Sequence, residues 1–145
     1  MDEEQNLSTI QYRVELSKYR LERAYKSLKI SKRDFSCGDY NEASSRAYYA
    51  LFYALLAVNE LEGFESSKHS GVISHFKYAY LRTKIFDRRI SKFIDDSFLQ
   101  RRYADYEGFY KASPEDAQKQ IDIAEEVISL VQPYLESRWP KMKEE

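Results

Sequence analysis

The sequence contains little of what β-folds and disulfide scaffolds require. Among its 145 residues are 4 glycines, 3 prolines and a single cysteine, Cys37. Few residues therefore suit tight turns, and segments in which Val, Ile or Thr alternate with polar residues are nearly absent, so a strand-rich fold is not expected. One cysteine excludes an intrachain disulfide and a zinc site built from cysteines. These shortages predict an all-α protein.

Long apolar runs and a large excess of one charge are also lacking. No uninterrupted apolar run approaches the roughly 20 residues that cross a bilayer, so no contact with a membrane is expected. The 23 basic and 24 acidic residues nearly cancel, so any attraction to nucleic acid must be local. The chain opens with Met1 and three acidic residues, the reverse of a signal peptide, which predicts a cytoplasmic protein.

What the chain does contain is helical periodicity, because apolar residues recur at intervals of three and four along most of it. The spacing predicts long helices over about 7–35, 40–61 and 87–110, a short helix around 72–80, and a last long helix from Pro114. The prediction is a single domain over the whole chain, a bundle of four long helices plus one short helix.

Local signals place several helix ends. Asp39 and Ser113 are suited to cap the helices that follow them, and Pro114 fits a first helical position. Pro133 is expected to distort or end the last helix. The tail from about Trp139 is expected to fray.

The second predicted helix is apolar around most of its circumference, which is typical of a helix in the centre of a bundle. Small residues at spacings of four and three would let a neighbour approach it closely: Ala43, Ala47, Ala50, Ala54 and Ala57. The chain also has 13 tyrosines and 8 phenylalanines. Tyrosine has an apolar body and a polar tip, so this excess indicates either a tyrosine-rich core or an association surface that makes a dimer.

Patterns for metal or nucleophilic chemistry are missing. The two histidines, His69 and His75, are six residues apart, and no metal-ligand repeat accompanies them. A glycine-rich phosphate loop and a nucleophile elbow are absent as well. Neither a metal nor a cofactor is expected.

Two stripes of charged and aromatic residues remain as candidate sites. On the second helix the stripe consists of Glu42, Arg46, Tyr49 and Tyr53, and on the fourth of Arg101, Arg102, Asp105 and Tyr106. An ion pair within each helix explains the charges about as well as a binding role does. Residues 75–102 carry eight basic and three acidic residues, a net charge of +5, so this basic segment, with Arg88 and Arg89, is a candidate anion-binding surface.

At these residues the sequence resembles the HEPN family, the higher eukaryotes and prokaryotes nucleotide-binding domain. The resemblance covers roughly Leu21 to Ile128. It is carried by Gly-Asp-Tyr-Asn-Glu-Ala at 38–43, Ser-Arg-Ala-Tyr-Tyr-Ala-Leu-Phe-Tyr-Ala at 45–54, Lys-His-Ser-Gly-Val at 68–72 and Arg-Tyr-Ala-Asp-Tyr at 102–106. The resemblance implies an up-and-down helical bundle that forms a homodimer with its site near the dimer cleft. It also implies a neighbouring minimal nucleotidyltransferase in a two-gene toxin–antitoxin module.

Active members of that family are metal-independent ribonucleases with an Arg, four to six residues and then a His. This sequence departs from the pattern, because no His follows Arg101 or Arg102, and Asp105 before Tyr106 stands in its place. Cleavage through the RNA 2′-hydroxyl benefits from a group that titrates near neutrality, unlike an ordinary Asp (about 3.9) or Tyr (about 10).

The favoured interpretation is therefore a binding module for RNA, a nucleotide or a partner nucleotidyltransferase. Its expected binding residues are Arg46, Tyr49, Tyr53, Lys68, Arg88, Arg89 and Arg101, together with Arg102. The alternative is a ribonuclease toxin that uses Arg102, Asp105 and Tyr106, with His69 supplied from the following turn or across the dimer. What separates the two is whether His69 can approach Arg102.

Overall fold

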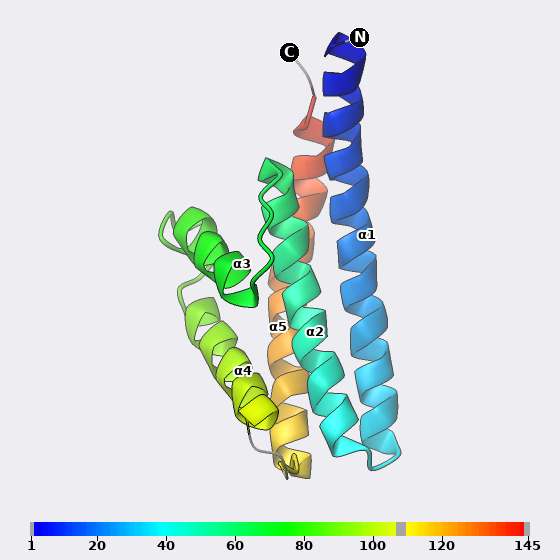
Figure 1. Cartoon of the computed structure of the whole chain (residues 1–145), viewed down its shortest axis with the longest axis vertical. Helices are drawn as coiled ribbons and strands as arrows, with labels where there is room; N and C mark the ends of the chain where they lie inside the picture. Colours follow the sequence, from blue (N-terminus) through cyan, green and yellow to red (C-terminus); the bar gives the residue numbers. More distant parts are fainter. Residues whose placement is uncertain (1, 107–109, 144–145) are drawn as a thin grey trace.

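The computed structural model describes residues 2–106 and 110–143 and is built from helices (Figure 1). The five α-helices are α1 (Asp2–Ser36), α2 (Tyr40–Asn59), α3 (His69–Phe76), α4 (Arg89–Tyr106) and α5 (Pro114–Arg138). The 3₁₀ turns η1 (Glu60–Glu62) and η3 (Trp139–Lys141) follow α2 and α5, and a π-helical turn η2 (Lys77–Leu81) follows α3. The described ranges contain no strand. The predicted all-α bundle of four long helices and one short helix is confirmed.

α2 occupies the centre of the bundle, as its apolar circumference predicts. It packs against α1 and α5 along their length, and it also contacts α3 and α4. Figure 1 shows α1, α2 and α5 side by side along the long axis, with α3 and α4 together on one side. Leu51, Leu55 and Val58 of α2 are buried in the same core as Ile94 of α4 and Ile128 of α5.

Serines on α1 bind the backbone of α2 where the alanine stripe faces it. Three buried hydroxyls donate hydrogen bonds to α2 carbonyls: Ser17 to Ala57 (2.7 Å), Ser27 to Arg46 (3.1 Å) and Ser31 to Ala43 (2.6 Å). Such bonds need the two backbones close together, which only small side chains allow. The predicted close approach is therefore confirmed, and α1 is the helix that makes it.

The helix ends follow their sequence signals in part. Ser113 caps α5 by a capping box in which its hydroxyl accepts from the Asp116 amide at 3.0 Å. Asp39 precedes α2 but makes no side-chain cap hydrogen bond, whereas Gly38 supplies the left-handed backbone of the turn, with φ of 81°. Pro133 does not end α5, which continues to Arg138. Because Pro133 is exposed, the carbonyl that loses its helical partner is on the solvent side.

The first residues of the tail that was expected to fray form a 3₁₀ turn. Trp139 begins η3, and its indole N–H donates to the hydroxyl of Ser17 at 2.9 Å. The same hydroxyl donates to the Ala57 carbonyl, so one buried serine joins α1, α2 and the turn after α5. The sequence signal for this contact was only a tryptophan near a proline, which does not identify its partner.

Glu60, the first residue of η1, is a buried acid, 4% exposed. Its carboxylate lies 3.7 Å from Nε of Arg20 on α1. Burial raises the pKa of Glu60, and the opposing attraction of Arg20 does not offset it. The carboxyl of Glu60 therefore loses its proton at a higher pH in the folded state than in the unfolded chain.

This raised pKa fixes the sign of a pH effect on stability. Protonated Glu60 and glutamine are alike in shape and charge, so Glu60→Gln should leave the free energy of unfolding almost unchanged below the ordinary pKa of 4.5. As the pH rises through that value to the folded-state pKa, the wild type should lose stability relative to the variant. Urea unfolding at pH 4 and pH 7 measures the difference. A variant that is less stable than the wild type at pH 7 alone would show that the attraction of Arg20 outweighs burial.

Candidate nucleic-acid interface

Aromatic side chains of α2 surround His69, the first residue of α3. The imidazole lies 4.0 Å from the ring centroid of Phe52, stacks on Tyr48 at 5.9 Å and meets Tyr49 edge-on at 6.0 Å. A hydrogen bond of 2.9 Å joins the Tyr48 hydroxyl to Nδ1 of His69. These contacts fix the position of the imidazole, which is half-buried.

Two arginines near the end of α4 reach the same group of rings. The guanidinium of Arg101 lies 5.9 Å from the ring centroid of Tyr49, and that of Arg102 lies 5.9 Å from Phe98. Phe98 in turn stacks on Tyr48 at 6.5 Å. Both arginines are held by attraction to ring faces. The arginine–aromatic cluster is defined as Tyr48, Tyr49, Phe52, His69, Phe98, Arg101 and Arg102.

His69 and the α4 arginines thus share neighbours. Tyr49 contacts both His69 and Arg101, while Tyr48 and Phe98 connect His69 to Arg102. The structure therefore brings His69, Tyr49, Arg101 and Arg102 into one cluster, and the approach of His69 to the arginines is what the alternative, ribonuclease interpretation requires. The side chains of Asp105 and Tyr106 lie outside the described residues.

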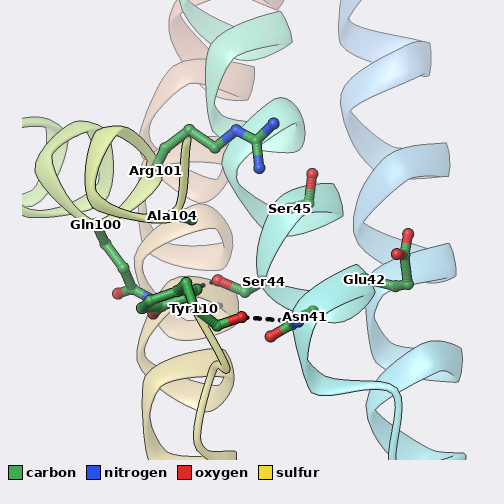
Figure 2. Close-up of a pocket in the computed structure, with 8 residues that line it drawn as sticks. All are labelled: Asn41, Glu42, Ser44, Ser45, Gln100, Arg101, Ala104 and Tyr110. Carbon is green, nitrogen blue, oxygen red and sulfur yellow. Dashed lines mark hydrogen bonds between the residues drawn. The ribbon is translucent and has the colours of Figure 1, made fainter. Parts of the chain in front are cut away.

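A polar cavity of about 290 Å³ lies beside Arg101, between α2 and α4. Figure 2 shows the Arg101 side chain extending from α4 toward α2 above Ser45. Gln100 donates to the Ser44 hydroxyl at 3.1 Å, and Asn41 donates to the Tyr110 carbonyl at 3.3 Å. The cavity is lined mostly by hydrogen-bonding groups, which suits a sugar or phosphate better than an apolar ligand.

The α2 stripe continues across the surface to α1. Tyr49 lies 6.3 Å from Tyr53, and Arg23 of α1 donates to the Tyr53 hydroxyl at 3.1 Å with its guanidinium 5.1 Å from the ring. Hydrogen bonds to Tyr53 and Tyr19 raise the pKa of Arg23. Arg23 was not identified from the sequence, because it is one of many charged residues on the outer face of a long helix.

The remaining predicted residues of α2 and α3 are at the edge of this surface. Arg46 and Glu42 are both exposed, and among the described ion pairs none joins them, so the structural explanation for Arg46 is not supported. Lys68 is exposed and immediately precedes α3.

At least three of the eight basic residues of the basic segment, Lys77, Arg89 and Lys92, are paired with acids. Arg89 binds Glu126 at 3.0 Å, and other pairs join Lys77 to Asp95, and Lys92 and Lys119 to Asp96. Arg88 and Arg89 lie about 20 Å along the chain from Arg101, since a helix rises 1.5 Å per residue. The structure does not bring them to the arginine–aromatic cluster.

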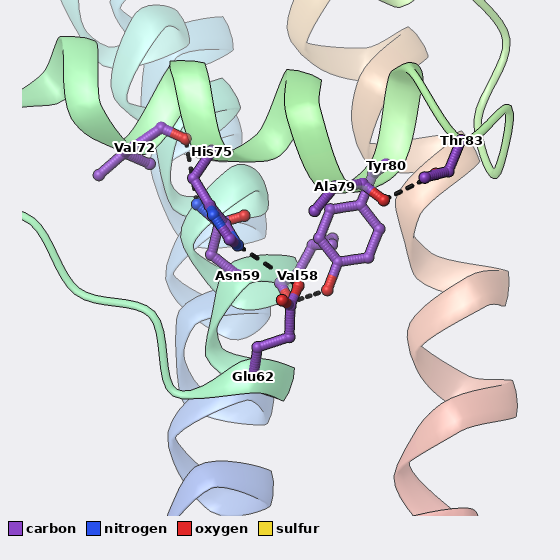
Figure 3. Close-up of polar contacts among 8 residues, drawn as sticks. All are labelled: Val58, Asn59, Glu62, Val72, His75, Ala79, Tyr80 and Thr83. Atoms are coloured by element: carbon purple, nitrogen blue, oxygen red, sulfur yellow. Dashed lines mark hydrogen bonds and ion pairs between the residues drawn. The ribbon is translucent and has the colours of Figure 1, made fainter.

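The second histidine has a different environment. His75 stacks on Phe64 at 3.8 Å, and its Nε2 lies 3.4 Å from a Glu62 carboxylate oxygen (Figure 3). Within residues 2–106 and 110–143, no three His, Cys, Asp or Glu side chains gather closely enough to hold a metal ion. No helix of the same ranges is both long and apolar enough to cross a membrane.

The chain as a whole is similar to several known proteins. A protein of Methanocaldococcus jannaschii named "Putative toxin" is 29% identical over 129 residues, 89% of this chain and 87% of that protein. A UPF0332 protein of Thermotoga maritima is 30% identical over 96 residues, covering 66% and 73% of the two chains. A UPF0332 protein of Archaeoglobus fulgidus is 32% identical over 97 residues, covering 67% and 76%. The HEPN domain family matches residues 17–136, which include the whole arginine–aromatic cluster, and the chain belongs to that family.

Proposed function

We propose that this HEPN domain is a binding module that holds single-stranded RNA through the arginine–aromatic cluster. The main observation in support is that the guanidinium groups of Arg101 and Arg102 each lie over an aromatic ring of the cluster. Guanidinium groups bind phosphate oxygens bidentately, and aromatic rings stack with bases of any sequence. The polar cavity beside Arg101 adds hydrogen-bonding groups for the backbone of the same strand.

The test is direct binding to a fluorescein-labelled, 12-nucleotide 2′-O-methyl RNA, measured by fluorescence anisotropy. The methylated strand cannot be cut through its 2′-hydroxyl, so binding is separated from cleavage. We expect affinity to fall with salt, with a slope of log K against log salt near −1.4, because two phosphate contacts on a single strand each contribute about −0.7. No binding at low salt, or binding that is independent of salt, would contradict the proposal.

A second candidate, a metal-independent ribonuclease, is favoured by one observation. The hydrogen bond between the Tyr48 hydroxyl and Nδ1 of His69 orients the imidazole, and Tyr49 contacts both His69 and Arg101. In this candidate Arg102 stabilises phosphate charge while His69, Asp105 or Tyr106 transfers the proton. Binding is preferred because α4 itself carries no histidine.

The cellular setting that we propose is a toxin-like, cytoplasmic two-gene module with a nucleotidyltransferase partner. One similar protein is named "Putative toxin", and members of the HEPN family occur in such modules. Identification of a nucleotidyltransferase in the adjacent open reading frame, and its co-purification with this chain, would support the assignment.

The proposal includes a homodimer at micromolar concentration. Large aromatic side chains are exposed on the outer face of α1, where Tyr12 is 62% and Tyr19 is 51% accessible. Tyrosines in such positions bury a large area on association. Sedimentation velocity should show a dimer that Tyr12→Ser with Tyr19→Ser dissociates, while Tyr78→Ser, also at an exposed tyrosine, leaves it intact. A species of only 17.3 kDa across that range would rule the dimer out.

A further inference from the structure

An open groove is lined by His69 but not by the α4 arginines. It has a volume of about 630 Å³ and lies between α1, the second half of α2 and the segment that joins α2 to α3. Its walls include Arg20, Phe52, Leu56, Glu60, Phe64 and His69. Because His69 and Phe52 also belong to the arginine–aromatic cluster, the groove is continuous with it.

The rings on both walls are held in place by neighbours outside the groove. On one wall, His69 lies against Phe52 and is hydrogen-bonded to Tyr48. On the other, Phe64 stacks on His75 with the rings within 5° of parallel, and Figure 3 shows His75 also directed at Glu62. The segment between the walls is close to α3, since a Cβ on Gly71 would collide with the Ser66 hydroxyl. The groove is therefore preformed.

The polar groups of the groove are incompletely satisfied. Nε of Arg20 is buried and has no hydrogen-bond partner. The nearby Glu60 carboxylate is 3.7 Å away, which is too far for a hydrogen bond. Buried donors in native proteins are nearly always paired, so a ligand that accepts a hydrogen bond would complete this wall.

We infer that the groove receives an unpaired nucleobase of the RNA strand whose phosphates are bound at Arg101 and Arg102. A base has flat faces for Phe52, Phe64 and His69. Its edge carries both acceptors, for Arg20, and donors, for Glu60. A phosphate fits less well, because Glu60 and Glu65 outnumber Arg20 among the acidic and basic residues that line the groove. The inference rests on the proposed function and adds the site at which a base of the bound strand is recognised.

The experiment compares two oligonucleotides of the same length and 2′-O-methyl backbone, one with bases and one abasic at every position. The wild type should bind the base-bearing strand at least tenfold more tightly, within the range measured for stacking of one base. Phe64→Leu removes a ring but keeps an apolar side chain. It should reduce that preference severalfold and leave binding of the abasic strand unchanged. Phe35→Leu, at a partly buried ring near the end of α1, is the matched control and should keep the preference.

A second variant tests the groove by filling it. Ser67→Met adds a flexible apolar side chain at an exposed lining position and should also reduce the preference, whereas Ser74→Met on α3 should not. If the wild type binds neither strand, the proposed function fails. If the groove variants and their controls behave alike, the groove inference alone is overturned. If the wild type binds both strands equally, both the groove inference and base stacking on the arginine–aromatic cluster are overturned, while phosphate binding at Arg101 and Arg102 stands. Thermal melts of all four variants identify any loss that comes from unfolding.

Discussion

Charge reversal at Arg101 and Arg102 is expected to weaken RNA binding by at least about a hundredfold. A hydrogen bond to a charged group contributes roughly 1.5–3 kcal/mol, so loss of two phosphate contacts accounts for a factor of this size. Arg101→Glu with Arg102→Glu also replaces attraction by repulsion. Anisotropy with the 2′-O-methyl strand measures the change. Loss of the two contacts with aromatic rings should cost only about 1 kcal/mol of stability per arginine, so the variant should remain folded.

The matched control makes the same charge change at the other end of α4. Arg88→Glu with Arg89→Glu should lower the affinity only severalfold, through the general field of the protein, because Arg89 already binds Glu126. The milder Arg101→Gln with Arg102→Gln should reduce the salt slope by about 1.4, corresponding to two lost phosphate contacts on a single strand. If Arg88→Glu with Arg89→Glu lowered the RNA affinity as much as the change at Arg101 and Arg102, the RNA would instead bind on the basic segment.

The helices and several of their ends were predictable because their causes are local. Apolar periodicity places the helices, and Ser113 with Pro114 is sufficient to place the start of α5. The alanine stripe of α2 predicts a close neighbour. It does not say which helix that is, since the partner serines on α1, such as Ser17, resemble any polar residue of a solvated face.

The candidate site was predictable only as separate pieces. The stripes of α2 and α4 contain Tyr49, Arg101 and Arg102, but the ring that receives Arg102 is Phe98, which periodicity assigns to the core. His69 lies in a segment with turn-like composition, and its contacts with Phe52 and Tyr48 depend on how α3 packs against α2. The net charge of the basic segment suggested that Arg89 was available to bind an anion. Its partner Glu126 lies on α5, 37 residues away in the sequence, so a local charge count does not include it.

The largest change in activity is expected from a histidine at position 106. The unmodified chain should leave RNA uncut at neutral pH, because α4 carries no histidine to act as general acid and base. Four residues separate Arg101 from position 106. Tyr106→His would therefore give the Arg, four residues and His that are the spacing of active HEPN ribonucleases. General acid–base catalysis contributes about 10²- to 10⁴-fold, so the variant should cleave a labelled RNA at least a hundredfold faster than the wild type, without added metal.

In the sequence, Asp105 stands where the missing histidine was expected, but only three residues separate Asp105 from Arg101. Asp105→His is therefore the matched control, since it introduces the same imidazole one residue earlier and outside that spacing. A gain with Tyr106→His alone would identify the chain as a silenced nuclease whose cluster still positions phosphate. Robust cleavage by the unmodified chain, abolished by Arg102→Ala and by His69→Gln, would overturn the preference for binding. In that case His69 supplies the proton transfer, and its hydrogen bond to Tyr48 fixes which ring nitrogen remains for the substrate. Tyr48→Phe should then slow cleavage while RNA affinity stays near that of the wild type, because Arg101 and Arg102 are unchanged.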